Sequence, residues 1–135
     1  MGNEGYIVIV DDEPAITRLL AFLIERSLGV KAKSYNNSAA ALRELTGDAS
    51  SVRLLICDLR MPDVDGLQLC RHLRKAECRW PILVLTAYAS EAVEAEARAA
   101  GADAVIQKPF DPGPFLDRIR ALLQASSERV PPASP

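Results

Sequence analysis

Five short apolar runs alternate with five helical patterns along this chain, and that alternation constrains the fold more than any other feature. Four of the runs are almost continuously apolar, which is typical of strands buried on both faces of a parallel sheet. The fifth run alternates apolar with polar residues, as an edge strand does. The apolar runs lie at residues 6–10, 53–57, 81–86 and 103–107, and the alternating run lies at residues 31–35.

The segments between these runs carry the start and stop signals of helices. Pro14 suits the first turn of a helix that Gly29 ends, and Ser38, Asp65 and Ser90 are of the residue types that cap helix N-termini. The remaining signals are stops at Gly47 and Gly101 and a start at Asp111 and Pro112. Strict alternation of strands and helices predicts a doubly wound α/β fold, in which helices cover both faces of a five-stranded parallel sheet.

The length of 135 residues fits one domain, which we expect at residues 1–124, followed by a Pro/Ser-rich tail or linker at residues 125–135. A net charge of −2 gives no basic surface for nucleic acid, and no apolar run approaches the ~20 residues that span a bilayer. The cysteines are odd in number and lack a C-x-x-C pair, which favours a reducing, cytoplasmic setting. They are Cys57, Cys70 and Cys78.

Charged and polar residues stand where the predicted strands end. Asp11 and Asp12 follow the first strand, Asp58 ends the third, Thr86 ends the fourth, and Lys108 follows the fifth. Because ligands bind outside the carboxyl ends of the strands in open α/β sheets, these side chains predict a site at one edge of the sheet.

Three carboxylates held together are unfavourable unless a cation neutralises them, and an all-oxygen set of this kind suits Mg²⁺. Asp58 is the carboxylate best placed to attack phosphorus as a nucleophile. Once a phosphoryl group is bound to Asp58, Lys108 and Mg²⁺ could bind its oxygens, and the Thr86 hydroxyl could donate a hydrogen bond to one of them.

Four motifs carry a resemblance to a known family. They are "VDDEP" (10–14), "DLRMPDVDG" (58–66), "LTA" (85–87) and "KPF" (108–110). In this order and spacing they resemble the receiver domain of bacterial two-component response regulators, over residues 6 to about 124. The resemblance implies a flavodoxin-like fold with the sheet order 2-1-3-4-5.

The same resemblance implies roles for the acidic residues. Asp58 is the expected phosphoacceptor, which takes its phosphoryl group from a sensor histidine kinase or a histidine phosphotransfer protein. Asp12 and Asp58 are expected to bind Mg²⁺ directly, together with the backbone carbonyl of Arg60. Asp11 is expected to act through a bound water.

The resemblance further implies a switch next to the phosphoacceptor. Thr86 would be the switch hydroxyl beside Ala87. Lys108 would contact the phosphate with its side chain, and the peptide bond between Lys108 and Pro109 would be cis. The family often has an aromatic residue three positions before the lysine, where this chain has Val105. The aromatic rotamer change that often reports phosphorylation is therefore lacking, and a shift of residues 87–101 is expected in its place.

Two positions flank the expected phosphoryl group. In receiver domains the residues at Arg60 and Tyr88 tune the hydrolysis of the acyl phosphate. Arg60 carries only donors and cannot orient an attacking water, and Tyr88 could cover the pocket, so we expect slow self-dephosphorylation. The alternative is that Tyr88 turns outward as a partner contact.

The expected function is a phosphorylation-controlled signalling module, with no enzyme activity beyond its own phosphorylation and dephosphorylation. The output face, and a possible homodimer interface, would lie on residues 90–100, 103–107 and 113–124. Direct binding to nucleic acid or to a membrane is not expected. Three alternatives are a degenerate receiver used as a scaffold, a phosphohydrolase with an aspartyl nucleophile, and a nucleotide- or flavin-binding domain. Arg60 stands where such a hydrolase has its general acid, and no glycine-rich loop follows the first strand.

Overall fold

The computed structural model describes residues 5–47 and 51–129. It contains a five-stranded sheet in the order β2-β1-β3-β4-β5, and every neighbouring pair of strands is parallel. The predicted fold class and sheet order are therefore confirmed. The strands are β1 (Tyr6–Val10), β2 (Lys31–Tyr35), β3 (Val52–Asp58), β4 (Ile82–Thr86) and β5 (Ala104–Gln107). The helices are α1 (Pro14–Leu28), α2 (Ser38–Leu45), α3 (Gly66–Lys75), α4 (Glu91–Ala100) and α5 (Pro112–Arg129).

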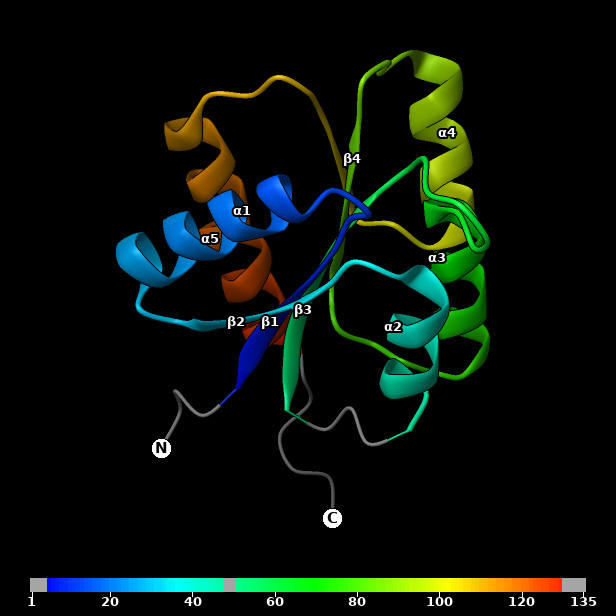
Figure 1. Ribbon diagram of the computed structural model, residues 1–135, viewed down its shortest axis with the longest axis horizontal. Helices are drawn as coiled ribbons and strands as arrows, with labels where there is room; N and C mark the ends of the chain where they lie inside the picture. The colour runs from blue at the N-terminus through cyan, green and yellow to red at the C-terminus, as the bar shows by residue number, and fades with distance from the viewer. Residues whose placement is uncertain (1–4, 48–50, 130–135) are drawn as a thin grey trace.

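The helices cover both faces of the sheet. Helices α1 and α5 lie on one face, and α2, α3 and α4 lie on the other (Figure 1). Strand β3 shows how one strand serves both layers, since Leu54 and Ile56 join the core beneath α1 and α5. Leu55 and Cys57 point the other way, into the core beneath α2, α3 and α4. Burial on both faces explains why the central strands are almost continuously apolar in sequence.

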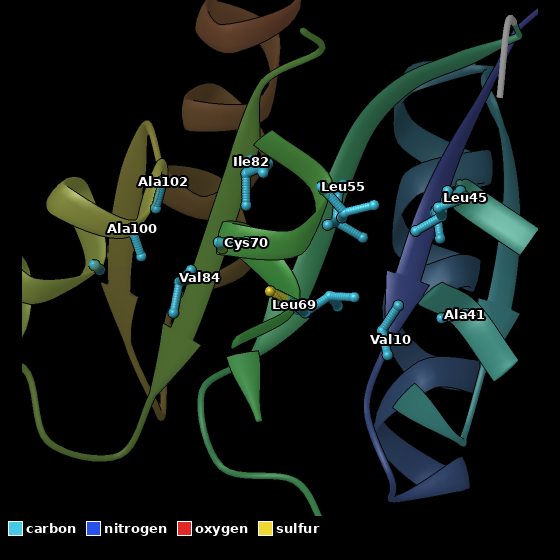
Figure 2. Close-up of a cluster of buried hydrophobic side chains, with 14 of the residues drawn as sticks. Val10, Ala41, Leu45, Leu55, Leu69, Cys70, Ile82, Val84, Ala100 and Ala102 are labelled. Carbon is cyan, nitrogen blue, oxygen red and sulfur yellow. The ribbon is translucent and has the colours of Figure 1, made fainter. Parts of the chain in front are cut away.

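Figure 2 shows part of the core beneath α2, α3 and α4. Leu55, Ile82 and Val84 project from the sheet, and Leu69 and Cys70 of α3 meet them. Helix α4 contributes much less to this core, because its buried residues are only alanines, Ala97 and Ala100. Burial of small side chains removes little apolar area from water, so α4 is held less strongly than α3.

Most predicted helix ends are confirmed. Gly29 ends α1 in the left-handed conformation with φ 66°, and Gly101 ends α4 in the same way with φ 115°. The Asp65 carboxylate accepts a hydrogen bond from the Gln68 N–H at 2.8 Å, as half of a capping box at the start of α3. The Ser90 hydroxyl likewise accepts from the Val93 N–H at the start of α4.

The prediction that Ser38 caps α2 is wrong. The N-cap is Asn37, whose side-chain oxygen accepts a hydrogen bond from the Ala40 N–H at 2.8 Å. Ser38 is the first residue of the helix and is buried. Its hydroxyl donates to the Pro62 carbonyl and accepts from the Val64 N–H, so it joins α2 to the loop after β3 instead.

Two boundaries differ from the sequence prediction. Helix α5 continues to Arg129, so it crosses the boundary expected at residue 124, and the end of the expected tail, residues 130–135, lies outside the described residues. Helix α2 has its C-cap at Thr46, one residue before the predicted stop at Gly47. Within the described part of the chain, no helix combines the length and apolar character that crossing a bilayer requires.

Candidate functional site

The strand ends bring the predicted site residues to one edge of the sheet. Asp11 directly follows β1, Asp58 is the last residue of β3, and Thr86 is the last residue of β4. Strands β1, β3 and β4 are neighbours, and β5 next to β4 leads directly into Lys108. The sheet order therefore places these four side chains together, as the strand-end argument predicts.

Three carboxylates form a cluster at this edge. One oxygen from each of Asp11, Asp12 and Asp58 lies within 4.8 Å of the others. Asp11 is 1% exposed and Asp58 is 8% exposed, whereas Asp12 is open to solvent. Negative charges packed this closely repel one another unless a cation lies among them.

Lys108 supplies one cation to this cluster. Its Nζ atom lies 3.1 Å from Oδ1 of Asp58 and 3.8 Å from Oδ2 of Asp11. One ammonium group neutralises one of three carboxylates, so the cluster keeps an excess of negative charge. The peptide bond between Lys108 and Pro109 is cis, as predicted.

Burial makes ionisation of the inner carboxylates costly. It is the largest cause that raises the pKa of Asp58 above its ordinary value, and the bond from Lys108 acts in the opposite direction. Burial also raises the pKa of Asp11, with a further contribution from the charge of Asp58. A bound divalent cation would reverse this effect, because it favours the charged form of each carboxylate.

One oxygen of Asp11 identifies the place where a cation fits. Oδ1 of Asp11 accepts a hydrogen bond from the Glu13 N–H at 2.9 Å. Oδ2 is buried, and no hydrogen-bond partner for it exists among the described residues. Buried carboxylate oxygens are normally satisfied, so an unsatisfied oxygen beside two further carboxylates fits a metal site with oxygen ligands.

Contacts that the sequence analysis missed support the loops of this site. Asn36 donates through Nδ2 to the Asp11 carbonyl at 2.8 Å and to the Thr17 hydroxyl at 3.1 Å. Gly66 packs against the backbone of Asp58, and Ser38 holds the intervening loop. None of these contacts is local in sequence, so spacing and composition carry no signal for them.

The expected switch residues lie on the loop between β4 and α4. The Thr86 hydroxyl is buried and accepts a hydrogen bond from the Tyr88 N–H at 3.1 Å. Ala87 is exposed, and Tyr88 is 72% exposed. In this structure Tyr88 therefore turns outward, which is the alternative to its covering the pocket. Arg60 is also exposed.

Comparison with known proteins assigns the chain to a family. Residues 7–120 match the response regulator receiver domain. The chain belongs to this family. The chain is similar to the transcriptional regulatory protein ResD of Bacillus subtilis (strain 168), with 36% identity over 126 residues. The match covers 93% of this chain and 51% of ResD, so the chain spans about half the length of that relative.

Solved receiver domains share the fold. A CheY-like receiver domain from Methanospirillum hungatei JF-1 has a TM-score of 0.83 at 27% identity, and the match covers 92% of this chain and 97% of that chain. A receiver domain from Clostridium thermocellum has a TM-score of 0.84 at 23% identity, with 92% and 98% of the two chains covered.

As a receiver domain, the chain is a phosphorylation-controlled signalling module. Receiver domains interact with histidine kinases or with phosphotransfer proteins. The cluster of Asp11, Asp12 and Asp58 gives this receiver domain an acidic group that could bind a metal. The alternatives of a scaffold, a phosphohydrolase and a flavin-binding domain are not favoured.

Proposed function

We propose that this receiver domain accepts a phosphoryl group on Asp58 from a histidine kinase or a histidine phosphotransfer protein, in the presence of Mg²⁺. The observation that carries this proposal is the contact of 3.1 Å between Lys108 Nζ and Asp58 Oδ1, inside a cluster of three carboxylates. A lysine in contact with the nucleophile can stabilise the negative charge that develops on the phosphoryl oxygens during transfer.

The surroundings of the three carboxylates favour Asp58 as the nucleophile. Asp11 is almost fully buried, and one of its oxygens is already held by the Glu13 N–H. Asp12 is exposed and has no contact with Lys108 among the ion pairs of the described residues. Asp58 is fixed at the end of β3 and is paired with the lysine, and its side chain is 12% exposed, compared with 1% for Asp11. It therefore combines access with a fixed orientation.

The transfer step exchanges one bond to phosphorus for another. An oxygen of the Asp58 carboxylate forms a bond to phosphorus while the phosphorus–nitrogen bond of the phosphohistidine breaks. The imidazole leaves with the electron pair of that bond, and the product on Asp58 is an acyl phosphate. Lys108 contacts the phosphoryl oxygens of this product, and the Thr86 hydroxyl turns from the Tyr88 N–H to donate to one of them.

Mg²⁺ would neutralise charge on the carboxylates and on the phosphoryl oxygens. Asp12, Asp58 and the backbone carbonyl of Arg60 would hold the ion directly, and Asp11 would act through a bound water. The unsatisfied Oδ2 of Asp11 supports this ligand set, since it is a buried acceptor that no described residue hydrogen-bonds, and even Lys108 Nζ is 3.8 Å away.

The proposed output face comprises α4, β5 and α5. Helix α4 buries only Ala97 and Ala100 and follows the loop that carries Thr86 and Tyr88, so a change at Thr86 can move it at little cost. The same face is the proposed interface of a possible homodimer. A reducing, cytoplasmic location is proposed as well, and the free thiols of Cys57, Cys70 and Cys78 support it.

Intact-protein mass spectrometry tests the proposed phosphoacceptor. With Mg²⁺ and acetyl phosphate, the wild type should gain one acyl phosphate that is stable in acid and labile in base, and Asp58→Asn should gain none. Asp63→Asn is a matched control, because Asp63 is an exposed residue of the following loop with φ 69°, a conformation that asparagine tolerates. Equal labelling of Asp58→Asn and the wild type would contradict the assignment.

A further inference from the structure

Hydrogen bonds of two side chains, those of Thr86 and Gln107, hold the loop at residues 87–90 in its present arrangement. The hydroxyl of Thr86 accepts from the Tyr88 N–H at 3.1 Å. The side-chain oxygen of Gln107 accepts from the Ala89 N–H at 3.0 Å. The first bond involves the expected switch residue, and the second involves a residue to which the sequence analysis gives no role.

The pairing of β4 with β5 explains how Gln107 reaches this loop. Gln107 is the register partner of Thr86, and the Lys108 N–H donates to the Thr86 carbonyl at 2.7 Å. The two strands end side by side, so a side chain at the end of β5 lies beside the loop that follows β4. Gln107 is thus adjacent in sequence to the lysine of the phosphoacceptor site and is bonded in space to the switch loop.

We infer that Gln107 is a positioning residue that holds residues 87–90 in the resting arrangement, in which the Thr86 hydroxyl faces the loop and not Asp58. This inference rests on the proposed function for its link to phosphorylation. Val105 is half-buried against the core beneath α3 and α4 and bears no hydrogen-bonding group. A polar link between β5 and the loop therefore comes from Gln107 and not from the position of the usual aromatic residue.

Both bonds stabilise the same state of the loop. When the Thr86 hydroxyl turns toward a phosphoryl group on Asp58, it releases the Tyr88 N–H and the loop can move. The bond between the Ala89 N–H and Gln107 must then either break or oppose this movement of the loop. Ala89 directly precedes Ser90, the N-cap of α4, so the bond from Gln107 also fixes where α4 begins. Any ligand that favours the switched state must work against this bond.

The size of the effect follows from the exposure of the bond. A neutral hydrogen bond at the surface contributes modestly to the preference for one state, so its loss should shift the equilibrium by about two- to fivefold. Removal of the Gln107 side chain should therefore tighten the binding of beryllofluoride, a phosphoryl mimic, by that factor. It should also free the Ala89 N–H in the unphosphorylated protein.

The experiment compares the wild type with Gln107→Ala, Gln107→Glu and Gln124→Ala. Gln107→Glu keeps an oxygen that can accept from the Ala89 N–H, and Gln124→Ala removes an exposed glutamine side chain from α5. Hydrogen exchange measured by NMR reports the Ala89 amide without ligand, and calorimetry reports the affinity for beryllofluoride with Mg²⁺.

Faster exchange of Ala89 and tighter beryllofluoride binding are expected in Gln107→Ala, with exchange near the wild-type rate in Gln107→Glu and no change in either readout for Gln124→Ala. Unchanged Ala89 exchange in Gln107→Ala would overturn the inferred restraint. Faster exchange with unchanged affinity would overturn its link to the switch. Failure of the wild type to bind beryllofluoride would instead contradict the proposed function, while Ala89 exchange would still decide whether Gln107 restrains the loop.

Discussion

Gly66 lies directly against the backbone of Asp58. A Cβ atom at Gly66 would be 2.5 Å from the Asp58 carbonyl oxygen and 2.9 Å from the Cα atom of Leu59. Backbone atoms cannot move aside as a flexible side chain can, so only glycine permits this approach. The first residue of α3 thus determines where the end of β3, and with it the proposed phosphoacceptor, can lie.

Gly66→Ala should destabilise the protein and reduce phosphorylation. The clash should cost about 1–3 kcal/mol, which exceeds the gain of up to ~1 kcal/mol from replacing glycine in a helix. Gly113→Ala is the control, because Gly113 also lies in the first turn of a helix and a Cβ there meets nothing within 4 Å. Thermal unfolding should give a lower Tm for Gly66→Ala and an equal or higher Tm for Gly113→Ala. Equal Tm values for the two variants would mean that the backbone near Asp58 can move away from the added Cβ atom without loss of stability.

Asp12→Ala should remove most of the affinity for Mg²⁺, because a proposed direct ligand is lost and water must replace it. Asp12 is the exposed member of the cluster, so its replacement should leave the fold intact. Calorimetric titration with Mg²⁺ measures the change, and Asp63→Asn again serves as the control for loss of a nearby negative charge. Unchanged affinity in Asp12→Ala would place the metal site elsewhere.

The stability of the metal-free protein should depend on pH through Asp11. Burial raises the pKa of this carboxyl, so the folded state holds the proton more tightly than the unfolded state does. The resulting stabilisation is fully present below the unfolded pKa, which is about 3.9, and is lost as pH rises through the folded pKa. Asp11→Asn cannot ionise and does not suffer this loss.

Urea unfolding in the presence of a chelator tests this dependence. The free energy of unfolding of Asp11→Asn relative to the wild type should increase between about pH 3 and pH 7. Addition of Mg²⁺ at neutral pH should lower the free energy of unfolding of Asp11→Asn relative to the wild type, since the metal favours the charged carboxylate of the wild type. A difference between the two proteins that stays constant over this pH range would argue against the buried charge as its cause.

The parts of the fold that follow from local chemistry could be predicted from the sequence. The sequence predicts Asp65 and Ser90 as N-caps because each capping bond spans only three residues. Asn37 and Ser38 are both of capping type, and local pattern cannot choose between them. The choice depends on the bonds of Ser38 to Pro62 and Val64, which lie 24 and 26 residues away.

The candidate site divides in the same way. Asp11, Asp58 and Lys108 could be predicted because strand ends meet at one edge of a parallel sheet. The supporting contacts of Asn36, Gly66 and Gln107 could not, because they depend on which loops lie beside each other once the sheet has formed.

Helix α4 should respond unevenly to phosphorylation. Its C-terminal end is held by Arg74, whose guanidinium donates twice to the Gly101 carbonyl and pairs with Asp103 at 2.9 Å. The N-terminal end lacks a comparable anchor among the described residues beyond the Ser90 cap and the bond from Gln107. Beryllofluoride should therefore change hydrogen exchange at residues 87–95 more than at residues 97–101, and Asp58→Asn should show neither change. A uniform response along the helix would contradict this difference between the two ends of α4.

Arg60 should slow the loss of phosphate from Asp58. Hydrolysis needs a water in line with the bond between phosphorus and the Asp58 oxygen, and Arg60 has no acceptor with which to orient that water. Its guanidinium, exposed two residues after Asp58, is free to turn to the phosphoryl oxygens. Arg60→Asn, which supplies an acceptor, should release phosphate roughly tenfold faster than the wild type.

Tyr88→Ala should give a smaller increase in the rate of phosphate release, because Tyr88 is 72% exposed and turned outward in this structure. Release of inorganic phosphate over time from each phosphorylated protein measures both effects, and a rate for Arg60→Asn no faster than that of the wild type would show that Arg60 does not guard the acyl phosphate.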